Sequence, residues 1–349
     1  MSVLNPTEAA ATVQSIVDVQ LPDGQIPWFS GGRTDPWDHV EAAMALAAGG
    51  RFEEAQAGYE WLRATQNPDG SWYRGYQDGV VVDPIREANF SAYIAVGLLH
   101  QLRSTGDESF VDEMWPTVVR ALGFVLDLQA PDGEIRWARS PDGAIADEAL
   151  LTGCSSMFHS LRCALELARV RGEPQPDWEL AAGTLGHAIV AHPDRFAPRE
   201  RFSMDWYYPV LGGALRGPAA LERLDADWDR FVVPGLGIRC VSDRPWVTGA
   251  ETCELVLALC AVGDDGRAGK LFADMQHLRD PDASYWTGYV YPDEARWPEE
   301  KTTWTSGAVV LASAMLAGDP ATRFVFGAEE LPVYPTRIDL HCTAHLPAA

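Results

Sequence analysis

Lysine is almost absent from this chain of 349 residues, which carries only Lys270 and Lys301. Acidic residues dominate, because 50 Asp and Glu stand against 27 Lys and Arg, for a formal net charge of -23 at pH 7. A charge of this sign and size repels phosphate backbones, which excludes nucleic acid as a partner. It equally disfavours an anionic membrane surface. We therefore expect neither nucleic acid nor membrane among the partners.

Long apolar runs are also missing. No stretch approaches the roughly 18 apolar residues of a membrane-spanning helix. The first residues contain neither the basic nor the apolar region of a secretory signal, so we expect a cytoplasmic protein. Hydrophobic residues nevertheless make up 47% of the chain, which excludes a disordered chain and supplies material for a large core.

Cysteines are few and lack the paired short spacings of a metal site or a disulfide framework. Most of the six lie inside apolar stretches, so we expect buried, reduced thiols. In the tail, His341, Cys342 and His345 resemble half of a metal clip without its second half. We therefore expect no metal and no cofactor. The six are Cys154, Cys163, Cys240, Cys253, Cys260 and Cys342.

A turn sequence occurs three times, at residues 20–26, 66–72 and 129–135. Each copy has Gln, then Pro with Asp-Gly, which is strong turn chemistry because Pro fixes φ and Gly accepts a positive φ. Each copy ends one helical pattern and opens a loop that leads into a second, more apolar helix. The repeat therefore indicates helical hairpins arranged in series.

Two kinds of helical pattern alternate along the chain. One kind has a single apolar stripe, as in Phe52, Ala55, Tyr59 and Leu62, and suits an outer helix that faces water. The other is apolar all round, as in residues 255–262, and suits a helix that is buried on every side. The outer helices are expected at 7–19, 52–67, 108–129, 176–192, 219–231 and 265–278. The inner helices are expected at 37–48, 86–104, 147–170, 205–216, 249–262 and 302–317.

This alternation predicts an all-α fold, an (α/α)6 toroid of six helical hairpins with inner and outer rings. No long stretch shows the alternation of a strand, although short extended pieces are expected near residues 80–82 and 285–291. No change in composition marks a linker, so residues 1–349 are expected to form a single domain. The tail from about residue 320 is expected to wrap the surface.

The loops that enter the inner helices are rich in aromatic and acidic residues, against an aromatic average of 10%. In a toroid these loops gather at one end of the ring, so they predict a cleft that binds substrate there. Any single Asp in such a loop also suits a helix cap, and any single Trp suits packing. The predicted binding residues are Asp35, Trp37, His39, Trp72, Tyr76, Glu87, Trp137, Asp147, Glu148, Asp205, Trp206, Tyr207, Trp246, Trp286, Tyr289 and Trp304.

Asp38 and Glu251 are the leading catalytic candidates. Pro36 in the first helical turn makes Asp35 the expected cap, which leaves Asp38 free for another role. Glu251 enters an apolar helix where an acid has no obvious structural use. Glycoside hydrolysis needs two carboxyl groups, a protonated acid and a base or nucleophile. We predict that one of the two residues is the general acid and the other the base.

Two resemblances to known families follow from these motifs. The segment from Gln66 to Trp72 resembles the Gln-and-Trp repeat of squalene cyclases and prenyltransferases, which are also helical toroids. Their chemistry does not carry over, because the Asp-x-Asp-Asp proton donor and a zinc set are absent from this sequence. The segments 114–122 and 128–133 resemble the third hairpin of six-hairpin glycosidases. This likeness implies a carbohydrate substrate.

A narrower resemblance lies in residues 35–39, Asp-Pro-Trp-Asp-His, together with the length and acidity of the chain. These features are similar to those of mycobacterial methylmannose polysaccharide hydrolases, which are α-endomannosidases. The resemblance implies a glycoside hydrolase that cleaves an α-linked intracellular polysaccharide, endo-acting on methylated mannan, with oligo- or polysaccharide as its partner.

The chemistry is expected to invert the anomeric carbon, by a two-carboxylate mechanism. A polysaccharide lyase or epimerase on the same fold is the alternative, since Arg74, Arg86, Arg136 and Arg139 could neutralise a uronate. A non-catalytic lectin or a cyclase-like isoprenoid-binding protein is a third. The sequence is also compatible with a homo-oligomer.

Overall fold

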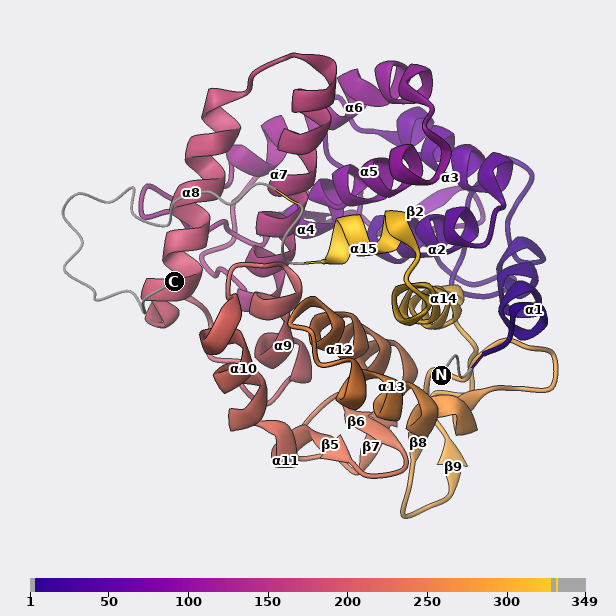
Figure 1. The fold of residues 1–349 in the computed structure, drawn as a ribbon. Coiled ribbons are helices and arrows are strands. Elements are labelled where there is room, and N and C mark those ends of the chain that lie inside the picture. Colours follow the sequence, from indigo (N-terminus) through magenta and orange to yellow (C-terminus); the bar gives the residue numbers. More distant parts are fainter. Residues whose placement is uncertain (1–3, 328–330, 332–349) are drawn as a thin grey trace.

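The computed structural model describes residues 4–327 and residue 331, and it confirms an all-α fold (Figure 1). The helices form two alternating sets, which we call outer and inner. The outer set comprises α1 (Pro6–Val17), α3 (Phe52–Thr65), α6 (Glu108–Leu126), α8 (Pro176–Ala191), α10 (Gly217–Ala226) and α13 (Asp265–Asp274). The inner set comprises α2 (Pro36–Ala48), α4 (Ala88–Ala92), α5 (Ile94–Thr105), α7 (Leu151–Arg171), α9 (Ser203–Leu211), α12 (Gly249–Ala261) and α14 (Thr303–Ala317). Shorter elements are α11 (Trp228–Phe231), α15 (Pro320–Phe326), η1 (Pro193–Arg195) and η2 (Met275–Leu278).

The inner helices are packed against one another in a closed order. α2 contacts α5, α5 contacts α7, and α7 contacts α9, while α9 contacts α12, α12 contacts α14, and α14 contacts α2. Most of them also pack against the outer helix that follows in the chain, as α2 does against α3 and α12 against α13, while α14 packs against α1. Because consecutive helices pair in this way, the inner helices all begin at the same end of the molecule. We call this end the rim.

The repeated turns bind each hairpin to the next. Gln66 donates two hydrogen bonds of 2.9 Å, one to the carbonyl of Gly70 in its own turn and one to Thr117 in α6. Gly70 has a φ of 91°, and a β-carbon there would lie 2.0 Å from the carbonyl oxygen of Arg120. Gln20 and Gln129 make the equivalent bonds to α3 and α8. The repeat is therefore a connector between successive outer helices.

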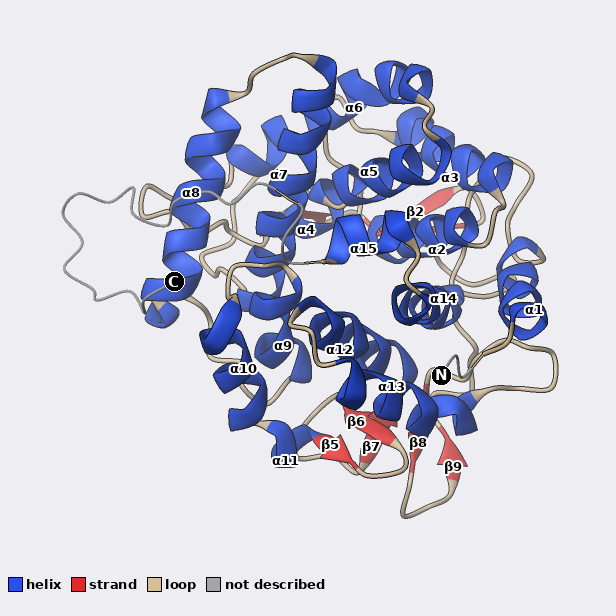
Figure 2. Ribbon diagram, in the orientation of Figure 1, coloured by secondary structure: helices blue, strands red, loops and turns tan. Residues whose placement is uncertain are grey.

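Short strands occupy the loops at the rim. The expected pieces are confirmed as β2 (Val80–Asp83) and β8 (Gly288–Val290). An antiparallel sheet of order β5-β6-β7-β8-β9 was not predicted, because its strands are only two or three residues long and show no alternation. Figure 2 shows it beside α12 and α13. The other strands are β1 (Gly75–Gln77), β3 (Arg86–Glu87), β4 (Ala138–Arg139), β5 (Val232–Val233), β6 (Gly237–Arg239), β7 (Trp246–Thr248) and β9 (Ala295–Arg296).

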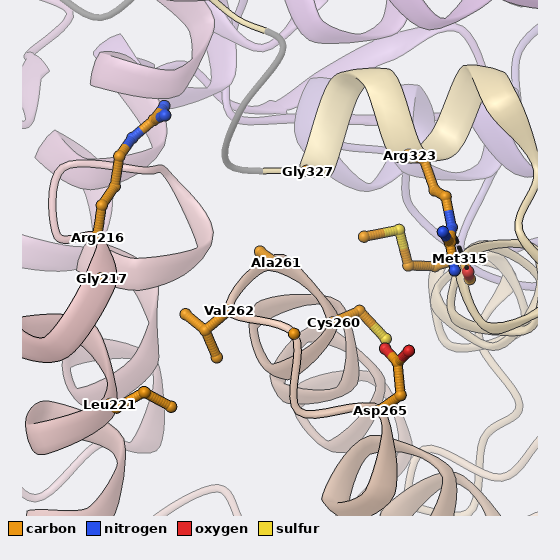
Figure 3. A pocket seen from close by; sticks show the side chains of 11 residues that line it. Arg216, Gly217, Leu221, Cys260, Ala261, Val262, Asp265, Met315, Arg323 and Gly327 are labelled. Atoms are coloured by element: carbon orange, nitrogen blue, oxygen red, sulfur yellow. Dashed lines mark hydrogen bonds between the residues drawn. The ribbon is translucent and has the colours of Figure 1, made fainter.

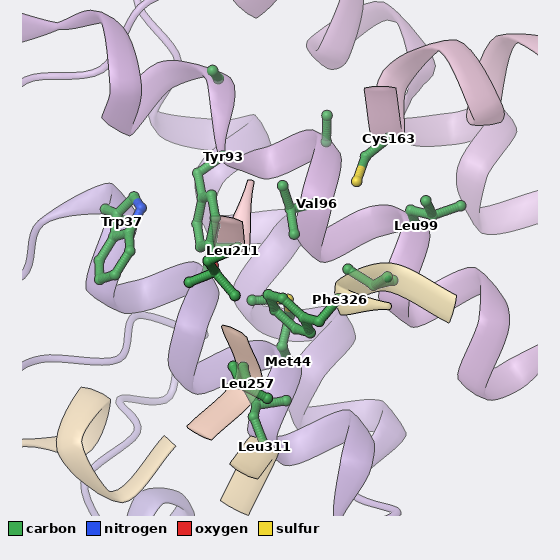
Figure 4. Close-up of a cluster of buried hydrophobic side chains, with 14 of the residues drawn as sticks. Trp37, Met44, Tyr93, Val96, Leu99, Cys163, Leu211, Leu257, Leu311 and Phe326 are labelled. Atoms are coloured by element: carbon green, nitrogen blue, oxygen red, sulfur yellow. The ribbon is translucent and has the colours of Figure 1, made fainter. Parts of the chain in front are cut away.

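The centre of the ring is filled with apolar side chains. Met44, Leu99, Leu257 and Leu311 come from four inner helices and gather with Phe326 of α15 (Figure 4). α15 packs against α5 and α14, with Phe326 only 3% exposed. It thus covers the end of the ring opposite the rim. The rest of the expected surface tail lies outside the described residues.

Among the described residues, no single helix has both the length and the apolar character needed to cross a membrane. Within this part of the chain, α14 and α15 would be long and apolar enough if taken together, but they are bent by 103° relative to each other.

Candidate active site

Acidic side chains occupy the first turn of three inner helices. Asp38, Asp205 and Glu251 are each the third residue of their helix, α2, α9 and α12. All three are buried, with 7–8% of their surface exposed. Glu87 directly precedes α4 at the same end. The structure therefore places both predicted catalytic residues at the rim.

Asp35 and Asp38 lie against each other at the start of α2. Oδ1 of Asp35 accepts hydrogen bonds of 2.9 Å from the backbone amides of Trp37 and Asp38, which confirms the predicted cap. Oδ2 of Asp35 accepts a third, of 2.7 Å, from the indole of Trp28. Burial, and then the neighbouring Asp35, raise the pKa of Asp38 well above its ordinary value. Burial beside Asp35 therefore favours the protonated form of Asp38.

Glu251 occupies the corresponding place on α12. Its carboxyl lies near the thiol of Cys240. Burial, and then the charge of Glu251, raise the pKa of this thiol. The same carboxyl contributes to the raised pKa of Tyr207, for which burial is again the main cause. Glu251 thus lies near the buried Tyr207 of α9 and the half-buried Cys240 of the segment that precedes α12.

Three aromatic rings pack together at the start of α2 and α14. Trp37 stacks on Tyr93 at a centroid distance of 5.0 Å and meets the edge of Trp304 at 6.0 Å. Figure 4 shows Trp37 and Tyr93 side by side. The indole nitrogen of Trp37 is buried and has no hydrogen-bond partner among the described residues. We call Trp37, Tyr93 and Trp304 the aromatic frame; it offers flat apolar faces and one donor that a ligand could use.

A second pair of acids lies one helical turn deeper. Glu41 follows Asp38 by three residues, and Glu254 follows Glu251 by three, so each lies on the same helix face as its predecessor. Oε2 of Glu41 accepts a hydrogen bond of 2.9 Å from Tyr93. Glu254 accepts one hydroxyl at each oxygen, from Tyr207 and Tyr208. We call Glu41 and Glu254 the inner carboxyl pair.

The inner carboxyl pair is fully enclosed. Each member is 2% exposed. Burial raises the pKa of Glu41 to about 7. Burial, followed by the charge of Glu41, raises the pKa of Glu254 well above its ordinary value. Since the charge of Glu41 acts on Glu254, ionisation of both carboxyls together is unfavourable.

The inner carboxyl pair was not predicted from the sequence, and neither were Tyr93 and Tyr208, two of the tyrosines that donate hydrogen bonds to it. A signal for it was present, because Glu41 and Glu254 each interrupt an otherwise apolar helix. The reasoning that selected Glu251, an acid without structural use in such a helix, applies equally to both. Nothing in the pattern of residues predicted that tyrosine hydroxyls would meet them.

Two further acids at the rim have shifted pKa values. Burial, and then the charge of Asp35, raise the pKa of Glu87 to about 8, which places Glu87 near the start of α2. Burial also raises the pKa of Asp205, whose Oδ1 accepts hydrogen bonds from the amide and hydroxyl of Thr152 in α7.

Several of the predicted binding residues have their polar groups engaged within the protein, and four of them are His39, Trp72, Tyr76 and Trp206. His39 accepts the amide of Ile26 at Nδ1, and its Nε2 lies 2.8 Å from the carbonyl oxygen of Gly58. The indoles of Trp72 and Trp206 donate to backbone carbonyls, and the hydroxyl of Tyr76 accepts the amide of Tyr73. These contacts account for the burial of all four side chains without a ligand.

The other predicted residues are spread around the rim. Trp137 is half-buried, and its carbonyl accepts the amide of Ala88, while Asp147 and Glu148 are exposed on the same loop. Trp246, Trp286 and Tyr289 belong to the region of the five-stranded sheet. Trp246 donates to the carbonyl of Trp297, and Trp286 donates to Asp280. The structure therefore does not gather all sixteen residues into one place.

No group of three or more His, Cys, Asp or Glu in the described residues could hold a metal ion. The five described cysteines form no disulfide. His341, Cys342 and His345 lie outside the described residues. A separate cavity of about 630 Å³ lies away from the rim, where α12 and α14 end near Val262 and Met315 (Figure 3). None of the predicted site residues lines it.

Comparison with solved structures shows the fold. A glycosidase in complex with glucose superposes with a TM-score of 0.73, at 13% identity, over 89% of this chain and 96% of the other. A D-mannose isomerase superposes with a TM-score of 0.69, at 12% identity, over 89% of this chain and 96% of the isomerase. An alpha-amylase from Clostridium perfringens superposes with a TM-score of 0.63, at 8% identity, over 89% of this chain and 98% of the amylase. These structures share the fold of this chain, and they include two glycan-hydrolysing enzymes and an isomerase.

The particular family follows from sequence. No family model matches the chain. However, the MMP endo-(1,4)-3-O-methyl-alpha-D-mannosidase of Mycolicibacterium hassiacum is 57% identical over 330 residues, which is 95% of this chain and 92% of the relative. The chain belongs to the family of this endo-mannosidase and is a glycoside hydrolase. The predicted resemblance is thereby confirmed, and the isoprenoid likeness is confined to the turn repeat.

Proposed function

We propose that this protein cleaves internal α-linked bonds of methylmannose polysaccharide by an inverting mechanism, with Asp38 as general acid and Glu251 as general base. The 57% identity to an endo-mannosidase supports the substrate. The observation that carries the mechanism is that Asp38 and Glu251 hold the same position, the third residue, in two helices of the inner ring.

We further propose that the fold is a complete (α/α)6 toroid in a single domain. The closed order of contacts among the inner helices supports this architecture. In such a ring the first turns of α2 and α12 both border the rim, which would set the two carboxyls on either side of a bound sugar.

The environments of the two acids support their assigned roles. A general acid has to be protonated before the reaction, and burial beside Asp35 favours the protonated form of Asp38. Asp38 would give its proton to the glycosidic oxygen as the bond from that oxygen to C1 breaks. Glu251 would take a proton from a water molecule whose oxygen attacks C1 from the opposite face. The products are a shortened chain and a new reducing end of inverted configuration.

The aromatic frame supports a methylated sugar. Methyl ethers and C–H faces are apolar, and the rings of Tyr93 and Trp304 have their centroids 5.0 and 6.0 Å from that of Trp37. The net charge of -23 supports a neutral chain rather than a uronate.

The test is to incubate the protein with 3-O-methylmannose oligosaccharides, unmethylated α-mannan and α-glucan, and to follow products by mass and by proton NMR. We expect shortened products from the methylated mannan and the β anomer as the first product. Asp38→Asn protein is the matched control. Cleavage of only the unmethylated glycans would contradict the proposed substrate. An α anomer as the first product would contradict the inverting mechanism.

A further inference from the structure

A cavity of about 410 Å³ opens at the rim beside α9. It lies between the first turn of α7, the start of α9 and the segment 193–200 that joins α8 to α9. We call it the Asp205 pocket; Leu151, Ile189, Phe196, Asp205 and Arg223 are among its lining residues. It is lined by neither Asp38 nor Glu251, so the proposed catalytic pair does not account for it.

One side of the Asp205 pocket is apolar. Ile189 and Phe196 are 6% and 7% exposed, and what remains exposed of them belongs to the pocket wall. Leu151, the first residue of α7, continues this surface. Pockets that bind small organic groups have this character, an apolar wall with a few fixed polar groups.

The polar groups of the Asp205 pocket are held in place before any ligand arrives. Oδ1 of Asp205 accepts both the amide and the hydroxyl of Thr152. The guanidinium of Arg223 donates 2.7 Å bonds to the backbone carbonyls of Asp205 and Trp206. These bonds fix the carboxylate and the guanidinium relative to each other, which lowers the ordering cost of binding.

The charges of the Asp205 pocket select against an anionic ligand. Its lining has four acids and two arginines. Since the acids outnumber the arginines, a phosphate or a uronate would meet net repulsion. A neutral ligand with hydroxyl donors fits better. The six charged residues are Asp194, Arg199, Glu200, Asp205, Arg223 and Asp227.

Arg199 connects the Asp205 pocket with the acids beside α2. Its positive charge opposes the burial-driven rise in pKa at both Asp205 and Glu87. Glu87 in turn is affected by Asp35, which caps the helix of Asp38. Arg199 therefore lies within electrostatic range of the pocket and of the candidate active site, and the two are neighbours along the rim.

We infer that the Asp205 pocket is a subsite that binds one neutral, methyl-bearing sugar unit of the polysaccharide chain, away from the bond that is cleaved. The inference rests on the proposed function. The apolar wall at Phe196 receives a C–H face or a methyl ether, and Asp205 accepts a hydroxyl of the same sugar. An endo-acting enzyme holds several units of its substrate, and the pocket supplies one such place.

The test measures binding, so that it does not depend on hydrolysis. A series of 3-O-methylmannose oligosaccharides of increasing length is titrated by calorimetry into Glu251→Gln protein and into the same protein with Phe196→Ala. We expect affinity to rise with length until one added unit fills the pocket, and we expect Phe196→Ala to remove about tenfold of that gain. Leu180→Ala, on the exposed face of α8, is the control and keeps the full gain.

Ala197→Trp provides a second variant, because Ala197 lines the pocket and is only half-buried. The added indole would fill the cavity and abolish the gain without removing a core side chain. Thermal unfolding checks that each variant is folded. Equal length dependence in the parent and in Ala197→Trp would overturn the subsite. If the wild-type enzyme cleaves none of these glycans, the proposed function fails, and the titration still decides whether the pocket binds sugar.

Discussion

The hydroxyl of Thr12 donates a 2.9 Å hydrogen bond to the carbonyl oxygen of Ala283. Ala283 has a φ of 71° and holds the place in its turn that Gly70 holds in the repeat, with the same bonds from residue 280 to 284 as from residue 67 to 71. The sixth connection therefore contains a fourth, altered copy of the turn. It binds the loop before α14 to α1, the first helix of the chain.

Ala283→Gly is expected to stabilise the protein by about 1 kcal/mol, because alanine is strained in the left-handed region and glycine is not. The free energy of unfolding in urea measures it. Ala10→Gly, on the exposed side of α1 and in ordinary helical geometry, is the control and should cost about 1 kcal/mol. A destabilised Ala283→Gly protein would contradict the expectation.

Gly70→Ala and Gly79→Ala separate strain from collision. Both glycines have positive φ, 91° and 73°, but a β-carbon at Gly70 would lie 2.0 Å from Arg120, whereas nothing lies within 4 Å at Gly79. We expect Gly79→Ala to cost about 1 kcal/mol and Gly70→Ala to cost at least 3 kcal/mol, since the turn would have to move away from α6. Equal losses of unfolding free energy in the two variants would show that the turn accommodates a β-carbon at Gly70.

Asp38→Asn and Glu251→Gln are each expected to lower kcat by at least about 100-fold, because each removes one proton-transfer group. Steady-state hydrolysis of a methylated oligosaccharide measures the effect, and circular dichroism checks the fold. Glu222→Gln, an exposed acid of α10, is the control. In Glu251→Ala, azide should restore turnover and yield a β-glycosyl azide. Rescue in Asp38→Ala instead would exchange the two roles.

Glu41→Gln should move the alkaline limb of the pH–rate profile to lower pH. Burial and Asp35 are the main causes of the raised pKa of Asp38, and the charge of Glu41 adds to them. Without that charge the pKa of Asp38 is lower, so the general acid loses its proton at lower pH. The enzyme therefore loses activity at lower pH as well. Glu53→Gln, exposed on α3, removes an acid of the outer surface and should leave the profile unchanged. A purely structural Glu41 would lower stability without moving the limb.

Glu41 should also make the stability of the protein depend on pH. Its pKa is about 7 in the folded protein against an ordinary 4.5, so the stability that protonation provides is complete below about pH 4.5 and is lost as pH rises through 7. The shift corresponds to roughly 3 kcal/mol. Urea unfolding at pH 5 and pH 8 should therefore differ less in Glu41→Gln than in the wild type. Parallel pH dependence in the two proteins would contradict this assignment.

The helices could be predicted from the sequence because their two patterns reflect two environments. In the predicted stripe Ala55, Tyr59 and Leu62 are buried, whereas Phe52, the first residue of α3, is 41% exposed. The continuous apolar run from Leu255 to Leu259 is buried throughout, as predicted. The Ala283 turn escaped prediction, since an alanine at positive φ leaves no mark in the sequence. The five-stranded sheet escaped because two-residue strands have no periodicity.

The site was harder to predict because residue type does not say what a side chain touches. His39 and Trp72 were selected for their chemistry, yet backbone groups engage them. Glu41 and Glu254 were passed over, although each is buried one helical turn beyond a predicted catalytic residue. A composition rich in aromatic and acidic residues indicates which end of the ring carries the proposed site. It does not separate the residues that face a substrate from those that build the wall behind them.

The packing of Phe326 against Met44, Leu257 and Leu311 has a consequence for how a polymer reaches the enzyme. A ring without a lumen in its described part cannot be threaded, so a long glycan does not need a free end in order to engage it. The polysaccharide would lie across the rim. Both products would then leave on the side from which the substrate came. Release of the two products would then require no passage through the protein.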